Sequence, residues 1–360
     1  MTGSAYAAAG VDVEAGERAV ALMRAAVERA TRPEVVGGFG GFAGLFDASA
    51  LAGYRHPLLA TSTDGVGTKV AIAAAMDVHD TIGRDLVAMV VDDLVVVGAE
   101  PLFMTDYIAC GKVHPERIAA VVTGIAQGCE LAGCALLGGE TAEHPGLLGP
   151  DEYDVAGAGT AVVEADAVLG PARVRTGDVL IAIASSGLHS NGYSLARKVL
   201  LTDAGWRLDR QVPELGRTLG EELLEPTRIY ARDILRLRDQ LGTDLHALSH
   251  ITGGGLAANI ARVLPVELAA DIHRSSWDPP AVFRLIGEVG SVSQADLEGT
   301  FNMGIGMVAV TEREAADAAV HTLAAAGLPA WLCGEVRDRA AGESGDAAAK
   351  GGGGGAVFVV

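Results

Sequence analysis

Apolar residues recur at helical spacing in three long segments of the first half of the chain. The pattern predicts helices over about residues 17–31, 81–98 and 115–131. Proline marks their limits: Arg32-Pro33 ends the first helix, Glu100-Pro101 ends the second, and Pro115 suits the first turn of the third. Short apolar or alternating runs at 56–63, 102–109, 135–137 and 153–163 lie between or after these helices and predict strands.

The sequence pattern changes near Gly170-Pro171, where the turn 175–178 introduces a new apolar strand. We take this position as a domain boundary. The predicted fold class is α/β (α+β), with an N-terminal segment at 1–17, one domain at 18–171 and a second at 172–339. The second domain has predicted strands at 179–184 and 303–310. Residues 340–360 form an Ala/Gly/Ser-rich tail, for which we expect disorder and no essential role, although 356–360 can pair locally.

The charge composition limits the classes of molecule that the protein can bind. The 360 residues carry 27 Lys and Arg against 46 Asp and Glu, a net charge of −19. Such a surface repels nucleic acid and anionic lipid, so we expect neither partner, and any phosphate on a substrate must be held locally. The N-terminus lacks the pattern of a signal peptide, no apolar run has membrane length, and the four cysteines lack zinc spacing. We therefore expect a cytoplasmic protein with reduced thiols.

Residues 63–69 read Thr-Asp-Gly-Val-Gly-Thr-Lys and follow a predicted strand. Asp64, Gly65, Gly67, Thr68 and Lys69 together supply a carboxylate, exposed backbone N–H groups, a hydroxyl and a cation, which suit a metal-bound polyphosphate. The spacing is not that of a Walker A loop. A solvated turn is an equally good interpretation of these seven residues alone.

Two more carboxylates are candidates for the same cation. Asp93 lies four residues after Met89 and seven after Leu86, so it is expected on the apolar face of its helix, where a charge needs a metal or another partner. Glu140 sits in the predicted turn Gly138–Thr141. The alternatives are a rotated helix that brings Asp93 to solvent and an ordinary exposed acid at Glu140.

Two polar segments of the second domain are phosphate or sugar candidates. The loop 185–194 contains His189, Ser190 and Asn191, and His189 is a candidate acid or base because its ordinary pKa lies near neutrality. Thr252, Gly253, Gly254 and Gly255 precede a predicted helix at 256–263, whose free N–H groups would favour an anion. A self-satisfied polar loop and a packing turn are the plain alternatives.

A glycine-rich loop at 37–44 includes Gly38, Gly40 and Gly41. It lacks the strand and helix of a dinucleotide fingerprint, so we interpret it as a flexible cover over a nucleotide, with a surface loop as the alternative.

Collinear motifs over nearly the whole chain, from Tyr6 to about Arg337, carry a family resemblance. The most specific are Arg32–Val35 with the glycine loop, 63–69, 79–83, 93–96, 98–103, 138–143, 154–157, 185–194, 226–230, 250–255 and 300–302. In order and spacing they resemble phosphoribosylformylglycinamidine cyclo-ligase, also called aminoimidazole ribonucleotide synthetase. One departure is Asp92, where the family pattern usually has Asn.

The resemblance implies a two-domain fold of the aminoimidazole ribonucleotide synthetase type, whose N-terminal sheets form a shared barrel in a homodimer. It implies ATP and Mg²⁺ as cofactors, a small phosphoribosyl substrate, and ATP-dependent closure of phosphoribosylformylglycinamidine to the aminoimidazole in purine biosynthesis. ATP would phosphorylate the formyl amide oxygen, and the amidine-side nitrogen would then attack the activated carbon.

The resemblance also implies roles for the candidate residues. Lys69, Asp93 and His189 would be catalytic, and Asp64, Asp93 and Glu140 would bind the metal. Nucleotide-binding residues would be Gly38, Gly40, Gly41, Asp64, Gly65, Gly67, Thr68, Lys69, Glu140 and Thr141. Substrate-binding residues would be Ser190, Asn191, Thr252, Gly253, Gly254 and Gly255.

Relatives with the same two-domain fold are the nearest rivals: formylglycinamidine ribonucleotide amidotransferase, selenophosphate synthetase and thiamine-monophosphate kinase. The chain has no glutaminase domain and no cysteine in its glycine loop, and its second-domain motifs follow the cyclo-ligase pattern. A non-catalytic scaffold is the hypothesis from another class. The retained carboxylates and Lys69 argue against it.

Overall fold

The computed structural model describes residues 13–37 and 41–360. They form two compact units. Unit 1 comprises the described parts of Met1–Leu94, Ala99–Asp166 and Ile229–Ala231, and unit 2 comprises Val95–Gly98, Ala167–Arg228 and Arg232–Val360. The main change between units, at 166–167, lies close to the boundary predicted at 171. No helix in the described ranges is long and apolar enough to cross a membrane.

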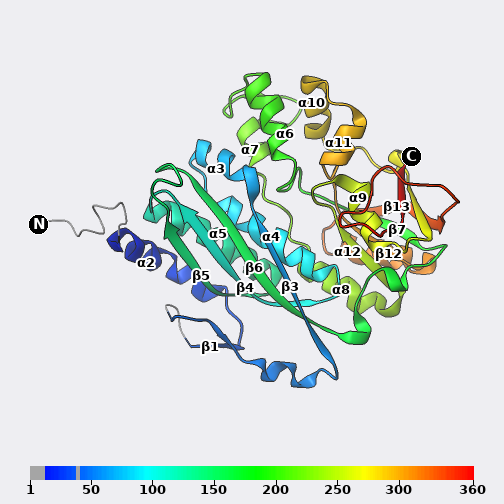
Figure 1. Cartoon of the computed structure of the whole chain (residues 1–360), viewed down its shortest axis with the longest axis horizontal. Coiled ribbons are helices and arrows are strands. Elements are labelled where there is room, and N and C mark those ends of the chain that lie inside the picture. Colours follow the sequence, from blue (N-terminus) through cyan, green and yellow to red (C-terminus); the bar gives the residue numbers. More distant parts are fainter. Residues whose placement is uncertain (1–12, 38–40) are drawn as a thin grey trace, which may run out of the picture. The chain divides into compact units, whose positions relative to one another are not determined.

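Unit 1 is built on a four-stranded sheet in the order β3 (Pro57–Gly65), β6 (Tyr153–Glu164), β4 (Glu100–Cys110), β5 (Ala135–Glu143). Both β3 and β4 run antiparallel to β6, and β5 runs parallel to β4. The four predicted strands are confirmed. The predicted turn at 138–141 is wrong, because Gly138 to Glu143 continue β5 and pair with Thr105 to Cys110. Figure 1 shows these strands side by side.

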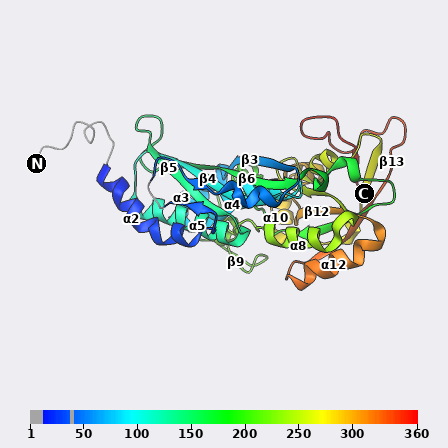
Figure 2. The same ribbon diagram turned by 90° about the horizontal axis from the view of Figure 1, so that it is seen from below.

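Helices cover one face of this sheet. The covering helices include α2 (Val13–Arg29), α4 (Asp80–Val95) and α5 (Pro115–Ala132), close to the predicted ranges except that α2 begins four residues early (Figure 2). Along β6 the side chains alternate: Tyr153 and Val155 are buried, whereas Asp154 and Ala156 are exposed. One face of the sheet is therefore packed, and the other lies bare in the single chain.

Glycine allows the helices to approach closely. A Cβ added at Gly83 of α4 would lie 2.3 Å from the backbone nitrogen of Ile125 in α5, and one at Gly124 would lie 2.0 Å from the carbonyl oxygen of Asp80. In β6, a Cβ at Gly159 would lie 2.8 Å from the Val90 side chain of α4. Helix α4 is thus pressed against both the sheet and α5 at positions where any side chain would force it away.

Unit 2 is built on a six-stranded mixed sheet. Its order is β10 (Leu245–His250), β12 (Ile305–Thr311), β7 (Val179–Ala184), β13 (Ala330–Asp338), β11 (Leu268–Ile272), β14 (Ala356–Val359). Residues 179–183 of β7 are all buried, so both faces of the sheet are covered. Helix α9 (Gly255–Ile260) packs beside β10 and β14, and α12 (Ala316–Ala325) packs on β7 and β13.

Shorter elements complete the two units. They are β1 (Val35–Val36), β2 (Leu45–Phe46), α3 (Val70–Met76), α6 (Tyr193–Arg197), β8 (Gln211–Val212), β9 (Arg217–Thr218), α7 (Leu219–Leu223), α8 (Ala231–Leu241), α10 (Ala281–Gly290) and α11 (Gln294–Thr300). All four cysteines are free and buried, in agreement with reduced thiols.

The prediction of a disordered tail is wrong for its last residues. Strand β14 adds to the edge of the unit 2 sheet by pairing in parallel with β11. Val357 is fully buried, Val359 is 5% exposed, and both belong to the hydrophobic core of the unit. The local pairing that the sequence allowed at 356–360 therefore belongs to the core, and the tail cannot be treated as dispensable.

We expect Val357→Asp to destabilise the protein by several kcal/mol, because it places an unpaired carboxylate in the core. Val360→Asp is the matched control, since Val360 is 55% exposed and ends the same strand region. Urea unfolding of both variants, and of a chain that stops after residue 340, measures the difference. Equal midpoints for the three proteins and the parent would contradict a structural tail.

Candidate functional site

Strand register brings two predicted segments of unit 1 onto the same rows of the sheet. Asp64 lies opposite Gly157, Gly157 opposite Asp106, and Asp106 beside Gly139. The next row runs from Gly65 through Ala156 and Tyr107 to Glu140. The 63–69 segment and the Gly-Gly-Glu-Thr segment are thus anchored at one level of the sheet, three strands apart.

Asp64 and Glu140 do not meet within the chain. Three inter-strand steps separate them by roughly 14 Å. Their side chains also take opposite faces, because Asp64 pairs with buried Gly157 and Glu140 pairs with Tyr107, which is 42% exposed. Among residues 13–37 and 41–360, no group of three or more His, Cys, Asp or Glu is placed to hold a metal ion. The expected convergence of three carboxylates on one cation therefore does not occur in this arrangement.

Among the predicted nucleotide contacts that the structure describes, Lys69 is the least accessible. It ends a short 3₁₀ turn, Gly67–Lys69, and its Nζ lies 2.8 Å from Asp85 Oδ1 of α4. Both side chains are fully buried. Removing either partner would leave a buried charge uncompensated, at a cost of about 3–5 kcal/mol. In this geometry Lys69 ties the segment after β3 to α4.

The prediction that Asp93 lies on the buried face of α4 is wrong; Asp92 does. Asp92 is fully buried and its Oδ1 accepts a hydrogen bond from the backbone N–H of Tyr230 at 3.0 Å. Asp93 is partly exposed. Helix α4 is rotated by one residue position relative to the prediction, which explains the difference. Asp92, the residue that departs from the usual Asn, is therefore the acceptor that holds the 229–231 segment on unit 1.

Part of the glycine loop lies outside the described residues, including Gly38 and Gly40. Gly41 is exposed. Gly44 is packed so closely on β5 that an added Cβ would lie 2.4 Å from the carbonyl oxygen of Leu137. The end of the loop therefore runs directly beside Leu137 of β5. Of the other predicted contacts, Gly67 and Thr68 are exposed at the end of β3.

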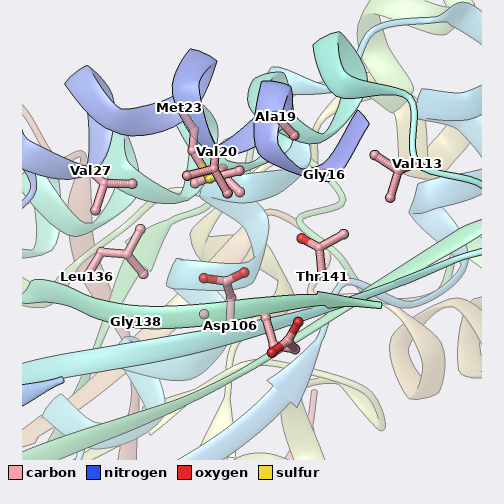
Figure 3. A pocket seen from close by; sticks show the side chains of 13 residues that line it. Gly16, Ala19, Val20, Met23, Val27, Asp106, Val113, Leu136, Gly138 and Thr141 are labelled. Carbon is pink, nitrogen blue, oxygen red and sulfur yellow. The ribbon is translucent and has the colours of Figure 1, made fainter. Parts of the chain in front are cut away.

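Sequence reasoning missed Asp106. It is 8% exposed and points to the same side of the sheet as Met104 and Ile108, which are fully buried. Figure 3 shows its carboxyl on the side of α2, across a cavity from Met23. Burial raises the pKa of its carboxyl from 3.8 to about 7, partly offset by a hydrogen bond from its own backbone N–H. A signal was present in the sequence, because Asp106 is the one charged residue on the apolar face of the alternating run 102–109.

In unit 2 the structure brings the two predicted substrate segments together. Asn191 Oδ1 accepts a hydrogen bond from the backbone N–H of Gly253 at 3.0 Å. Buried Asn259 donates to the carbonyl oxygens of Thr252 and Gly255 and so fixes the turn from below. Gly254 and Gly255 have φ values of +99° and +70°, a conformation that favours glycine. Ser190 and Asn191 are partly exposed beside this turn.

Two features limit the predicted chemistry of these segments. His189 is 1% exposed, with φ +64°, and its Nε2 accepts the Ser186 backbone N–H at 3.2 Å. That bond requires the Nε2 lone pair, so proton abstraction by this nitrogen would first have to break it. The helical segment after the glycine turn ends at the predicted residue, but only its first six residues, α9, are α-helical and Ala261–Val263 form a 3₁₀ turn, which leaves a small dipole for an anion.

Comparisons with known proteins place the chain in a family. Residues 47–163 match the model "AIR synthase related protein, N-terminal domain" and residues 175–346 match its C-terminal counterpart. A phosphoribosylformylglycinamidine cyclo-ligase from Geobacillus sp. (strain WCH70) is 51% identical over 333 residues, 92% of this chain and 95% of the relative. The protein of that name from Shouchella clausii is 53% identical over 333 residues, 92% and 96% of the two chains. The chain belongs to the phosphoribosylformylglycinamidine cyclo-ligase family.

More distant solved structures share the fold of this cyclo-ligase family member. Thiamine-monophosphate kinase from Stenotrophomonas maltophilia matches with a TM-score of 0.63 at 19% identity, over 94% of this chain and 95% of its own. A hydrogenase maturation protein HypE in complex with ATP matches with a TM-score of 0.59 at 17% identity, over 90% and 86% of the two chains. These matches establish a two-domain mixed α/β architecture for the chain.

The raised pKa of Asp106 predicts a pH-dependent stability. Below about pH 4 the carboxyl is protonated in both states; between about 4 and 7 only the folded protein keeps the proton, so the stability contributed by this group falls as pH rises. We expect Asp106→Asn to stabilise the nucleotide-free protein at pH 8 by a few kcal/mol relative to its effect at pH 4.

Urea unfolding of the parent and the variant at pH 4.5, 6 and 8 tests this expectation. Asp151→Asn is the control, because the Asp151 side chain is 81% exposed. A stability difference between parent and Asp106→Asn that stays constant over the three pH values would show that the carboxyl titrates normally.

Proposed function

We propose that this chain catalyses the ATP-dependent closure of phosphoribosylformylglycinamidine to 5-aminoimidazole ribonucleotide, with ADP and phosphate as the other products. The observation that carries the proposal is identity of about half over 92% of the chain to relatives named for this reaction. The reaction belongs to purine biosynthesis, and we place it in the cytoplasm.

The chemistry requires two parts. The formyl amide oxygen is a poor leaving group until it takes the γ-phosphoryl group of ATP, after which a nitrogen of the amidine attacks the activated carbon and phosphate departs. Catalysis of such a transfer depends mainly on positioning and on stabilising charge at phosphate oxygens. Residues that hold ATP and residues that hold the phosphoribosyl substrate are therefore separate sets.

We assign the nucleotide to unit 1. The ends of β3 and β5 supply Asp64, Gly65, Glu140 and Thr141 at one level of the sheet, and the glycine loop ends beside β5. Mg²⁺ is commonly held by one or two carboxylates together with substrate phosphates, so it does not need a preformed cage. Partly exposed Asp93 and the Asp64 carboxylate would then act as separate contacts, with the bound phosphates completing the coordination; Lys69 would orient the β3 segment through Asp85.

We assign the substrate to unit 2, where Asn191 joins the polar loop to the Thr252–Gly255 turn. Backbone N–H groups of a glycine turn suit a phosphate in a protein of net charge −19, because they bring positive potential without a cation. Ser190 and Asn191 would contact the sugar or the reacting end. His189, with Nε2 engaged, would position this loop.

We also propose a homodimer in which the bare face of the unit 1 sheet is covered by the same face of a second copy. That face carries Leu59, 66% exposed, and Tyr107, 42% exposed, among threonines and alanines. An exposed apolar sheet face is costly in water, and small residues allow two sheets to approach closely. Closing the sheets into a barrel is the arrangement that the family resemblance implies.

The activity has a direct test. Purified protein with ATP, Mg²⁺ and phosphoribosylformylglycinamidine should form the aminoimidazole product, and ADP in equal amount. We expect Asn191→Ala to raise the KM for the phosphoribosyl substrate about tenfold with little change in the KM for ATP, because it removes the acceptor that fixes Gly253. Gln211→Ala in the exposed β8–β9 hairpin is the control. Absence of product with intact ATP binding would refute the proposed reaction.

The dimer is tested by a charge on its proposed interface. Leu59→Glu should shift the protein to monomer in sedimentation velocity, since two copies of the carboxylate would be buried on the shared face. Leu131→Glu on α5, where Leu131 is 50% exposed, carries the same change on the helical side of unit 1 and should remain dimeric. A Leu59→Glu protein that sediments like the parent would exclude this face.

A further inference from the structure

The C-terminal segment of unit 2 packs against the helix that follows the glycine turn. Gly354 and Gly355 directly precede β14, and α9 lies beside that strand. The backbone N–H of Gly355 donates to the carbonyl oxygens of Ala261 and Leu264, both at 3.1 Å. An added Cβ at Gly354 would lie 1.9 Å from the Ala261 carbonyl oxygen. The segment therefore presses on the 3₁₀ turn that continues α9, at a position that excludes any side chain.

This contact is passed along α9 to the glycine turn. All six residues of α9 are buried, and Ile260 shares a hydrophobic core with Val357 of β14. Asn259, the neighbour of Ile260, donates to the main-chain oxygens of Thr252 and Gly255 at 3.2 and 2.8 Å. A displacement of α9 would therefore move the side chain that fixes the turn.

A second route reaches the turn through α11. The backbone N–H of Arg274 donates to the main-chain oxygen of Val360 at 2.7 Å. The Arg274 guanidinium forms a bidentate ion pair with Glu298 of α11, at 2.7 and 2.8 Å. An added Cβ at Gly255 would lie 1.6 Å from the Glu298 carbonyl oxygen. The backbone of Glu298 thus meets the turn directly, while Arg274 holds its side chain and Val360 holds Arg274.

We propose that the C-terminal segment 354–360 positions the Thr252–Gly255 turn for the phosphoribosyl substrate. One route runs through Gly354 and α9, and the other runs through Arg274 and Glu298. The inference rests on the proposed assignment of this turn to the substrate, and it gives the segment a role in the reaction beyond completing the sheet. Arg274 and Glu298 are positioning residues, because they act on the substrate through the turn.

The conformation of the turn explains why it needs this support. Gly254 and Gly255 have φ values of +99° and +70°, and glycine loses more conformational freedom on ordering than any other residue. A turn that is ordered only when substrate binds subtracts that cost from the affinity, whereas a turn held beforehand does not. A bidentate Arg–carboxylate pair suits the task, because its two parallel hydrogen bonds fix direction as well as distance.

Steady-state kinetics tests the second route. The Arg274 side chain is 45% exposed, so Arg274→Ala leaves the core intact. It should raise the KM for phosphoribosylformylglycinamidine about fivefold and leave the KM for ATP and kcat near the parental values. Arg274→Lys keeps one charged contact with Glu298 and should give an intermediate KM. Arg313→Ala is the matched control, because Arg313 forms a 2.7 Å pair with Glu335 elsewhere in unit 2, and it should behave like the parent.

The division between the two constants separates positioning from general stability. A loss of folded protein would lower kcat and leave both KM values unchanged. An unchanged KM for the phosphoribosyl substrate in Arg274→Ala, or an equal rise in both KM values, would overturn the proposal.

Hydrogen exchange, followed by mass spectrometry on the full chain, tests both routes without relying on activity. The N–H groups of Gly253 and Gly255 are hydrogen-bonded in the turn, and they should exchange about tenfold faster in Gly354→Ala and in Arg274→Ala. Gly53→Ala is the control for the added methyl group, since a Cβ there meets nothing within 4 Å. Exchange at the turn that is equal in the parent and both variants would overturn the proposal.

Product formation by the parent separates this proposal from the proposed reaction. If the parent forms product while the variants keep its KM values and its exchange rates, the positioning role fails and the reaction stands. If the parent forms no product but exchange accelerates as expected, the reaction fails and the hold of the C-terminal segment on the turn stands.

Discussion

The close approach of helix α4 to the sheet and to α5 is the constraint on which unit 1 depends. Glycines at positions 83, 124 and 159 remove the side chains that would hold these elements apart. The contact brings Asp85 of α4 to the Lys69 ammonium, and it puts Asp92 where it can accept the Tyr230 N–H. Both interactions join segments distant in the chain, and both are buried. A shift of α4 by even 1 Å would therefore disturb the ends of β3 and the 229–231 segment together.

The same logic governs the base of the proposed nucleotide site. Asp106 can occupy a buried position because Gly139 on the neighbouring strand has no side chain. Residues 138–141, which the sequence predicts as a turn, are in fact part of strand β5, and a strand fixes their spacing more rigidly than a loop would. Gly139 therefore shapes this site by leaving room for the Asp106 carboxyl, and not by making the chain flexible.

Most elements of the fold follow from local patterns, because helical spacing and alternation are set by which face of each element is buried. The strands at 153–164 and 179–184 and the helix that begins at Pro115 were predicted within a residue or two. Errors occurred where a long-range contact decides. Strand β14 has no signal apart from its four apolar residues and needs β11 as its partner. The choice between Asp92 and Asp93 turned on one residue of helical phase, which periodicity alone does not resolve.

The candidate site was predicted unequally for a related reason. Motifs identified the segments, and the register now places the β3 and β5 segments on shared rows and joins Asn191 to Gly253. Sequence could not say on which face of the sheet each carboxylate lies, and that distinction separates Asp64 from Glu140 and exposes Asp106 as a candidate. A charged residue on the apolar face of a strand cannot be explained by solvation, so it requires a partner from the fold or from a ligand. By that criterion Asp106 is a stronger functional candidate than Glu140, because an exposed carboxylate needs no partner at all.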